Sequence, residues 1–407
     1  MQLHELMSPV YTDDPLKLYE LFQQHGPVIQ AGNQVMVIGN YALNEALLSD
    51  KRVGKDYMQS VRIRFGEQVA SQPVFQGINK MFLVLNPPEH SRLRGLIMKS
   101  FSSREVQPFK EMALTLGNQL IDSFIERGRC DLAKEFAFPL PVQIICHMLD
   151  VPVTEADKLG GAAADLVRIF DPQISADDLQ KAGEAYQKLY DYFSVLIQSR
   201  RFSQQDDLVS LFIRSEYEGH QLEHDEIIAN VILLFIAGHE TTSNMICNTV
   251  LALYAHPPQL ALVKQDTRWI PDAINECLRY DSSVQMVYRI ALQDLDMNGY
   301  LIPAGTSLFL MLGAANHDPD KFSDPHNLLI QRQQGRCLSF GAGIHHCLGY
   351  RLAMAELEVA LQLILSRLPN MCIISSAVQR NHRINLRGVS ALPVVWDSPS
   401  LCPVTHK

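Results

Sequence analysis

Residues 340–349, FGAGIHHCLG, place two histidines and one cysteine side by side, and each of these side chains can bind a metal ion. Adjacent side chains project in divergent directions, so His345, His346 and Cys347 cannot readily face one zinc ion together. A dinucleotide-binding loop is also disfavoured, because G-x-G-x-x-G would put His346 where the backbone must approach the ligand closely. The remaining interpretation makes Cys347 the single ligand.

The segment after Cys347 has the pattern of a long amphipathic helix that ends at Pro369. A cysteine at a helix N-terminus meets unpaired N–H groups and the positive end of the helix dipole, which stabilise the metal-binding thiolate. Gly341 and Gly343 would let the preceding backbone lie flat against a large planar group such as a haem. A buried thiol before a helix is the structural alternative. The apolar positions of the predicted helix are Leu352, Leu357, Leu361, Ile364 and Leu368.

The stretch FGAGIHHCLGYRLAMAE resembles the haem-binding signature of the cytochrome P450 family, F-G-x-G-x-H-x-C-x-G, at every specified position. The resemblance implies that Cys347 is the axial thiolate ligand of the iron of haem b, that His345 binds a haem propionate, and that His346 occupies a variable position. Thiolate ligation favours cleavage of the O–O bond. The resemblance also implies the cytochrome P450 fold, mainly α with small β-sheets, in which the haem lies between a long central helix and the loop and helix of the cysteine ligand.

The apolar segment from Ile227 to Gly238 is too short to cross a bilayer of roughly 30 Å at ~1.5 Å per residue, so it predicts a buried helix. The segment continues as AGHETTSN, and buried carboxylates and hydroxyls cost free energy unless they are bonded or used. Thr241 could bond the carbonyl of Ala237 one turn back. The stretch also resembles the oxygen-activation motif of the family. This implies that Gly238 leaves room for O2, the co-substrate, and that Glu240 and Thr241 deliver protons to it.

Glu276 and Arg279, in AINECLRY, lie one helical turn apart, and such a pair on a surface contributes only ~0.2–0.5 kcal/mol. They match the E-x-x-R pair of the family, and Arg332 matches the loop arginine that completes this network. The resemblance implies that these three residues act in folding rather than in chemistry.

Three further cations stand at family positions for the haem propionates. His90 and Arg94 lie four residues apart, on one face of a predicted helix, and Arg289 lies in a predicted strand, YRIAL. Each alone would be a solvated basic residue. The resemblance implies that they bind the propionates together with His345.

The sequence departs from the family pattern at Cys337, Ser283, His317 and Met354, where histidine, proline, arginine and arginine are common in the family. Cys337 and Met354 are expected near the thiolate face of the haem, so these two departures concern haem contacts and the docking of redox partners.

The composition is that of a folded globular protein, with 47% hydrophobic and 19% charged residues among 407 and no low-complexity tract. No repeat or linker divides the chain, so we predict a single cytochrome P450 domain over residues 1–407. A formal charge of −9 without a basic run disfavours nucleic acid as a partner. The first residues carry no pattern of a secretory signal, so we expect a cytoplasmic protein whose eight cysteines are reduced.

The resemblance implies a monooxygenase that hydroxylates or epoxidises a hydrophobic small molecule, for example in secondary metabolism. No flavin or ferredoxin segment is present, so electrons would come from separate partners, a ferredoxin and its NAD(P)H-dependent reductase. Arg92, Lys99, Arg336 and Arg351 are candidates for docking an acidic ferredoxin. Two alternatives stay open: an isomerase or dehydratase of the same fold that needs no external electrons, and a non-catalytic haem-binding protein. The acid and hydroxyl pair of AGHETTSN disfavours both, and we expect a monomer.

By family position, substrate walls are expected in the variable loop before His90, in residues 170–174 and near residues 388–390. The lining is largely apolar, with Gln285 as a candidate polar anchor, which suits a hydrophobic molecule of medium size. A fatty acid, a terpenoid, a polyketide and a carrier-bound acyl chain all stay open. The individual residues predicted to line the pocket are Leu234, Ala237, Val284, Gln285, Val287 and Val389.

Overall fold

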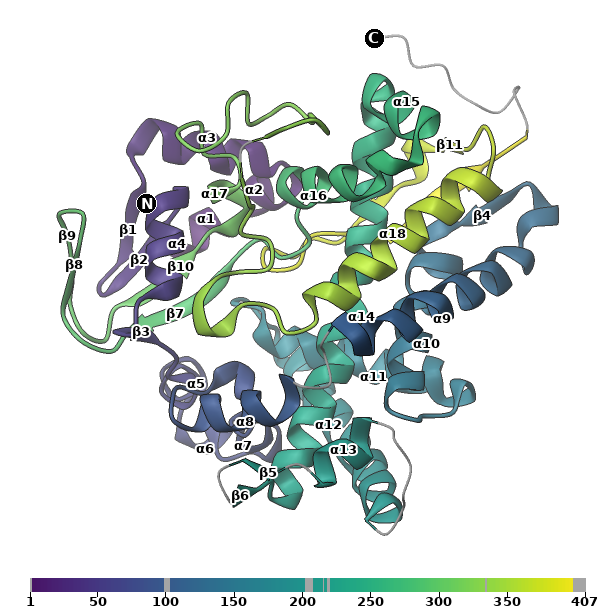
Figure 1. Ribbon diagram of the computed structural model, residues 1–407. Helices are drawn as coiled ribbons and strands as arrows, with labels where there is room; N and C mark the ends of the chain where they lie inside the picture. Colours follow the sequence, from purple (N-terminus) through teal and green to yellow (C-terminus); the bar gives the residue numbers. More distant parts are fainter. Residues whose placement is uncertain are drawn as a thin grey trace. The chain divides into compact units, whose positions relative to one another are not determined.

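The computed structural model divides the chain into two compact units, which are described separately (Figure 1). The first unit comprises Met1–Val53, Pro108–Pro141 and Thr241–Lys407, and the second comprises Gly54–Gln107 and Val142–Glu240. The single domain expected from the sequence stays a prediction. The structure describes residues 2–98, 103–201, 208–214, 216–217, 220–333 and 335–397.

Helices make up most of the described chain. In chain order, the α-helices are α1 (Leu3–Leu6), α2 (Pro9–Asp13), α3 (Pro15–His25), α4 (Tyr41–Ser49), α5 (Tyr57–Phe65), α6 (Glu67–Ala70), α7 (Pro73–Ile78), α8 (Glu89–Met98), α9 (Ser103–Asp122), α10 (Pro139–Met148), α11 (Ala156–Val167), α12 (Ala176–Arg200), α13 (Leu208–Arg214), α14 (His224–Ala255), α15 (Pro257–Gln265), α16 (Ile270–Tyr280), α17 (Leu312–Ala315) and α18 (Tyr350–Arg367).

The strands are short and form small sheets. They are β1 (Val28–Gly32), β2 (Val35–Ile38), β3 (Val53–Gly54), β4 (Arg129–Asp131), β5 (Glu216–Tyr217), β6 (His220–Gln221), β7 (Val287–Ala291), β8 (Leu295–Met297), β9 (Tyr300–Ile302), β10 (Ser307–Leu310), β11 (Cys372–Ile373), β12 (Gln379–Arg380), β13 (Val389–Ala391) and β14 (Pro393–Val395).

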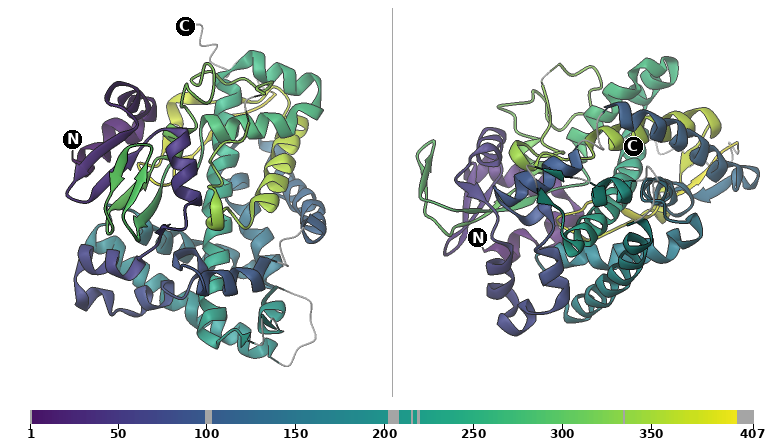
Figure 2. Two further views of the ribbon diagram at one scale, coloured as in Figure 1. Left: turned by 60° about the vertical axis from the view of Figure 1, so that its left-hand side comes forward. Right: turned by 60° about the horizontal axis from the view of Figure 1, so that its bottom comes forward.

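One sheet joins segments that lie far apart in the sequence, with the strand order β1-β2-β10-β7-β3. In the left view of Figure 2, the purple strands near the N-terminus lie beside green strands from the middle of the chain. Strand β10 pairs parallel to β2 and antiparallel to β7, and this register sets Arg289 opposite Leu308. Arg289 is buried, whereas its neighbours Tyr288 and Ile290 are only half-buried. The alternation of the strand therefore turns this arginine inward.

Helix α18 confirms the amphipathic pattern of the sequence, because all five predicted apolar positions are buried. The helix begins at Tyr350, two residues later than the predicted segment, with Gly349 as its N-cap. The reason lies in the backbone: the amide of Cys347 donates a hydrogen bond to the carbonyl of Phe340, at 2.9 Å, and so belongs to the preceding loop.

Helix α14 confirms the buried helix predicted at Ile227–Gly238 and extends well beyond it. From Ile227 to Val250 its side chains are buried, except at Ala237–Thr241, where they are half-buried or exposed. The segment with polar groups is therefore also the open segment of the helix. Among the described helices, none combines the length and apolarity that a membrane span requires.

A carboxyl group is buried in α18. Glu356 is only 3% exposed, and its Oε2 atom has no hydrogen-bond partner among the described residues. Burial raises the pKa of this carboxyl to about 8, because a charge is poorly solvated in the core. Glu356 is therefore neutral at moderate pH.

Replacement of Glu356 by glutamine should change how stability depends on pH. The carboxyl ionises near pH 4.5 in the unfolded chain but only near pH 8 in the folded one. Its contribution to the free energy of unfolding is therefore complete below pH 4.5 and falls as the pH rises toward 8, by up to ~1.4 kcal/mol per pH unit. Urea unfolding at several pH values should show that the free energy of unfolding of Glu356→Gln increases relative to that of the wild type as pH rises. Glu358→Gln should show no such relative increase. Parallel curves for the wild type and Glu356→Gln would contradict the prediction.

Candidate functional site

Cys347 lies in a loop held by its own backbone. The amide of Gly341 donates to the carbonyl of Leu338 at 2.7 Å, and that of His346 to the carbonyl of Gly343 at 3.1 Å. Together with the bond from Cys347 to Phe340, these contacts fold the loop into successive tight turns, one of them the 3-10 turn Gly343–His345. The Cys347 side chain forms no disulfide and is half-buried. The loop therefore presents it in a fixed and accessible position.

Gly343 is required by a close backbone contact. Its φ of +66° is a conformation that L side chains rarely adopt. A Cβ atom at this position would lie 2.1 Å from the carbonyl oxygen of Leu48, at the end of α4. The sequence suggested that this glycine keeps the loop flat against a haem. The structure gives a further reason, which is that the loop touches the main chain of α4.

Asn316, which the sequence reasoning did not select, anchors the start of the same loop. Its Oδ1 accepts a hydrogen bond from the amide of Leu338 at 2.7 Å, and its Nδ2 donates to Ser339 Oγ at 2.9 Å. Ser339 Oγ in turn donates to the carbonyl of Leu278 in α16, at 2.7 Å. The only signal in the sequence was an asparagine at the end of AAN, directly before the long loop.

The structure brings Glu276, Arg279 and Arg332 together. Arg279 donates to both carboxylate oxygens of Glu276, at 2.8 and 2.9 Å, and Arg332 Nε lies 3.1 and 3.2 Å from the same oxygens. Arg279 and Glu276 are 2% and 4% exposed. Arg279 Nη1 also donates to the carbonyls of Asn316, at 2.9 Å, and Pro325, at 2.7 Å. The network therefore extends to Asn316, the anchor of the cysteine loop.

Arg289 provides the clearest test of whether the first unit fits a haem. Its guanidinium donates to the carbonyl of Tyr288 at 2.8 Å, and no carboxylate of the described residues pairs with it. Burial lowers its pKa to about 10. A buried cation of this kind needs an anion, and a haem propionate supplies one. His345, in the cysteine loop, is half-buried. These residues fit the predicted cofactor.

His90 and Arg94 lie in the second unit, on α8, four residues apart and therefore on one helical face. His90 is buried, with its ring 6.3 Å from that of Phe82, and Arg94 is half-buried. The helix gives both side chains a common direction, which a shared anionic group requires.

The open segment of α14 contains Glu240 and Thr241. A Cβ atom added to Gly238 would meet only Ile145 Cδ1, at 3.9 Å, so the position is not crowded by packing. Burial lowers the pKa of the intervening His239 to about 4, so this imidazole is neutral at physiological pH. A small residue, a carboxyl group and a hydroxyl thus follow one another where the helix is least covered.

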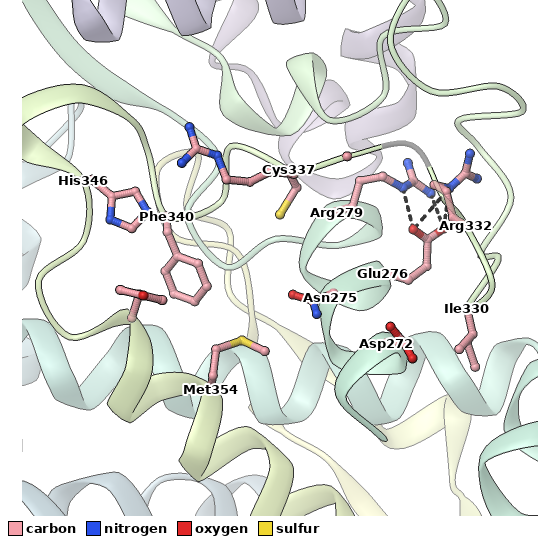
Figure 3. Close-up of a pocket in the computed structure, with 13 residues that line it drawn as sticks. Asp272, Asn275, Glu276, Arg279, Ile330, Arg332, Cys337, Phe340, His346 and Met354 are labelled. Carbon is pink, nitrogen blue, oxygen red and sulfur yellow. Dashed lines mark hydrogen bonds and ion pairs between the residues drawn. The ribbon is translucent and has the colours of Figure 1, made fainter. Parts of the chain in front are cut away.

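A pocket of about 600 Å³ lies beside the cysteine loop in the first unit. Figure 3 shows Cys337 and Met354 on opposite sides of it, with Phe340 and His346 along one flank. The rings of His346 and Phe340 lie 5.2 and 6.2 Å from that of Tyr350, which also lines the pocket. Two of the family departures, at Cys337 and Met354, therefore share one concave surface next to Cys347.

The predicted substrate residues differ in their surroundings. Gln285 already uses both ends of its amide, because Oε1 accepts from Tyr19 at 2.6 Å and Nε2 donates to the carbonyl of Ser282 at 2.7 Å. Val389 is fully buried in β13. These contacts weigh against a substrate role for both. Val284 and Val287 are half-buried and Ala237 is exposed, while Leu234 is 8% exposed.

The sequence matches the family described as Cytochrome P450 over residues 10–371. A relative from Xylella fastidiosa (strain Temecula1), assigned the name cytochrome P450 133B2, is 48% identical over 394 residues, which cover 96% of this chain and 99% of the relative. The cytochrome P450 monooxygenase PikC of Streptomyces venezuelae is 32% identical over 397 residues, covering 95% of this chain and 92% of that protein. These similarities confirm the family that the sequence resembles.

A solved structure confirms the expected fold. P450BioI in complex with an acyl carrier protein ligated to hexadec-9Z-enoic acid matches with a TM-score of 0.89 and 30% identity, covering 95% of this chain and 99% of that chain. The predicted fold, mainly α with small sheets, is the fold of that protein.

Glu276→Gln should destabilise the folded protein by about 3–5 kcal/mol, because it leaves two buried guanidinium groups without their shared anion. Urea unfolding followed by circular dichroism measures the change. Glu67→Gln is the control, because Glu67 pairs with Arg62 on the surface and should contribute below ~1 kcal/mol. If Glu276→Gln does not fold, Arg332→Lys retains the charge and should give a smaller loss. Equal losses for the Glu276 and Glu67 variants would contradict this role.

Proposed function

Because the chain belongs to the cytochrome P450 family, we propose that it hydroxylates or epoxidises a hydrophobic small molecule with electrons from a ferredoxin and its NAD(P)H-dependent reductase. The chain is a cytochrome P450 monooxygenase, and its family uses haem b as cofactor and O2 as co-substrate. When bound, the haem supplies the activation of O2 from which one oxygen atom enters a C–H or C=C bond. The observation that carries the proposal is the rigid loop that presents Cys347.

In this proposal Cys347 is the axial ligand of the iron. Burial raises the pKa of the Cys130 and Cys146 thiols to about 12, and Cys247 and Cys277 are fully buried, which makes these four inert thiols. Among the described cysteines that form no disulfide, Cys337 and Cys347 are the half-buried ones. Cys347 alone of the two stands at the ligand position of the family signature, three residues before the start of α18.

Four basic residues would bind the haem propionates in this proposal, and Arg289 supports it most directly. Its buried guanidinium lacks a carboxylate partner among the described residues, and an anionic propionate would supply one. His345 stands two residues before Cys347, so the same loop that presents the thiol would also contribute a propionate contact. His90 and Arg94 would act as a pair from one face of α8.

Glu240 and Thr241 would move protons to O2. Cleavage of the O–O bond consumes protons, and an apolar helix offers few groups that can hold one. The Thr241 hydroxyl would donate a proton at its Oγ1, and the Glu240 carboxylate would replace it from solvent. The exposure of α14 at this segment supports a role beyond helix packing. An isomerase or dehydratase would not need this pair.

Electrons would enter beside the cysteine loop, at the pocket lined by Phe340, His346 and Tyr350. Arg336 lines the same pocket and is 58% exposed, with only an exposed contact to Glu45 at 3.9 Å, and Arg351 lies with its guanidinium over the ring of Tyr350. These two cations suit an acidic ferredoxin. Of the other docking residues predicted, Arg92 is already paired with Glu226, and Lys99 lies outside the described residues.

The substrate would be a hydrophobic molecule that contains an alkyl or acyl chain. This rests on the similarity to P450BioI, whose structure holds a protein-bound acyl chain, and on the apolar character of Leu234, Ala237, Val284 and Val287. Both a free acid and a carrier-bound chain are compatible with this class.

Cys347→His should abolish the strongly red-shifted absorption band that a thiolate-ligated haem gives after reduction and binding of carbon monoxide. The imidazole is a weaker electron donor than the thiolate, so the band should move to the position typical of histidine-ligated haem. Cys337→Ser is the matched control and should retain the shifted band. A shifted band that survives Cys347→His would show that another residue is the ligand.

Thr241→Ala should uncouple the reaction, because the hydroxyl that donates a proton is lost. Oxygen and NAD(P)H consumption should continue while the product formed per O2 falls by about 100-fold, at the lower end of the range that loss of a positioned proton donor produces. Thr242→Ala makes the same chemical change at a buried neighbour and should leave coupling unchanged. Unchanged coupling in Thr241→Ala, or turnover without O2 and reductant, would contradict the proposal.

A further inference from the structure

Helix α5, in the second unit, contains a buried hydroxyl group that the fold does not use. The helix begins at Tyr57 after Asp56, whose side chain accepts from the amide of Gln59 at 3.1 Å, and it ends at Gly66. The Tyr57 hydroxyl is shielded from solvent and has no hydrogen-bond partner within the part of the chain that the structure describes. A buried polar group without a partner costs about 1–3 kcal/mol, so a partner from outside the chain would stabilise it.

The same face of α5 ends in a cation. Tyr57, Val61 and Arg64 are four and three residues apart, so they lie along one side of the helix, about 10 Å from first to last at ~1.5 Å per residue. Val61 is buried between them, whereas Arg64 is exposed. A phenol at the inner end and a guanidinium at the outer end thus share one side of the helix.

Aromatic rings connect the two groups. The ring of Phe75 lies 6.4 Å from that of Tyr57 and 5.8 Å from that of Phe65. The guanidinium of Arg64 lies 4.6 Å over the Phe65 ring. This geometry is typical of a cation–π contact and fixes the direction of the guanidinium. The rings of Phe65 and Phe75 therefore form an apolar surface between a hydrogen-bond donor and a positive charge.

Arg64 is also held by a second segment. Its Nη2 donates to the carbonyls of Asp171, at 2.8 Å, and Pro172, at 3.2 Å, which follow the 3-10 turn Arg168–Phe170 and precede α12. The sequence predicted substrate walls both in the loop before His90 and in residues 170–174. Arg64 therefore bonds two segments in which substrate contacts were expected.

The electrostatics of Tyr57 suit the recognition of an anion. Burial raises its pKa above the ordinary value, so the hydroxyl stays protonated and acts as a donor. The positive charge of Arg64 acts in the opposite direction and lowers the pKa of Tyr57, but burial has the larger effect. The nearby carboxylate of Glu67 is paired with Arg62, at 2.9 Å.

We propose that Tyr57 and Arg64 bind the carboxylate of a free long-chain carboxylic acid, which is the substrate of this monooxygenase. The proposal rests on the monooxygenase function and deepens it by naming the substrate class. The phenol donates one hydrogen bond to the carboxylate, the guanidinium supplies the opposite charge, and Phe65 and Phe75 pack against the first methylene groups of the chain. Fixing the acid end in this way would determine which carbon is oxidised.

The test compares dodecanoic acid with its methyl ester and with 1-dodecanol, titrated into the haem-loaded enzyme. The shift of the haem absorption band and calorimetry both report binding. Tyr57→Phe should weaken binding of the acid by about 10–100-fold, the range expected for a hydrogen bond to a charged group. Arg64→Gln should weaken it by about 2–5-fold, an effect that salt should reduce. Binding of the ester and the alcohol should change less than about two-fold in both variants, because they carry no charge.

Two matched controls accompany these variants. Arg62→Gln removes a cation of the same helix, and Tyr254→Phe removes another buried hydroxyl that lacks a partner among the described residues, in the first unit. Each of these control substitutions should change the binding of the acid and the binding of the ester by the same factor. If Tyr57→Phe weakened binding of the acid, the ester and the alcohol equally, Tyr57 would contribute only packing, and the proposal would be overturned.

Other outcomes separate this proposal from the function it rests on. No effect of Tyr57→Phe on any ligand, or tighter binding of a carrier-bound dodecanoyl thioester than of the free acid, would overturn the carboxylate site while the red-shifted band of the carbon monoxide complex remained. Absence of that band in the wild type would instead overturn the haem-thiolate assignment.

Discussion

A single carboxylate, that of Glu276, connects the parts of the first unit on which the cysteine loop depends. Its two oxygens accept from Arg279, from Arg332 and from the amide of Leu329, the last at 2.9 Å. Since Arg279 also binds the carbonyl of Asn316, and Asn316 binds the amide of Leu338, the loop that presents Cys347 is joined to α16 through an unbroken series of hydrogen bonds. Buried charges make such a series rigid, because any broken bond leaves an unsolvated group.

Rigidity around the thiol contrasts with the open segment of α14. The helix is covered on both sides of Ala237–Thr241, so its buried turns hold the open one in place. A reactive segment supported in this way needs little reorganisation before a ligand binds. Strand β7 does the same for Arg289, whose inward direction follows from the register with β10. The proposed haem contacts thus come from regular elements, and only Cys347 and His345 come from a loop.

Local spacing predicted the features whose partners are near in sequence. The stripe of α18, the buried helix at 227–238 and the Glu276–Arg279 turn follow from periods of three and four residues. Features with distant partners could not be predicted. Asn316 binds Leu338, 22 residues away, and Tyr19 binds Gln285, 266 residues away. Without the second contact, Gln285 looked like a free amide suited to a substrate. The start of α18 could not be predicted for a similar reason, since the amide of Cys347 donates its hydrogen bond to the carbonyl of Phe340 in the preceding loop.

The contact between Gly343 and Leu48 is made by main-chain atoms on both sides. Replacing the Leu48 side chain therefore removes neither of the atoms that form this contact, although that side chain is itself buried in the core. A residue inserted into or deleted from α4 would instead rotate and translate its last carbonyl by ~100° and ~1.5 Å, and the cysteine loop would lose its support. The support of the thiol thus depends on the length of α4 more directly than on the side chain of Leu48.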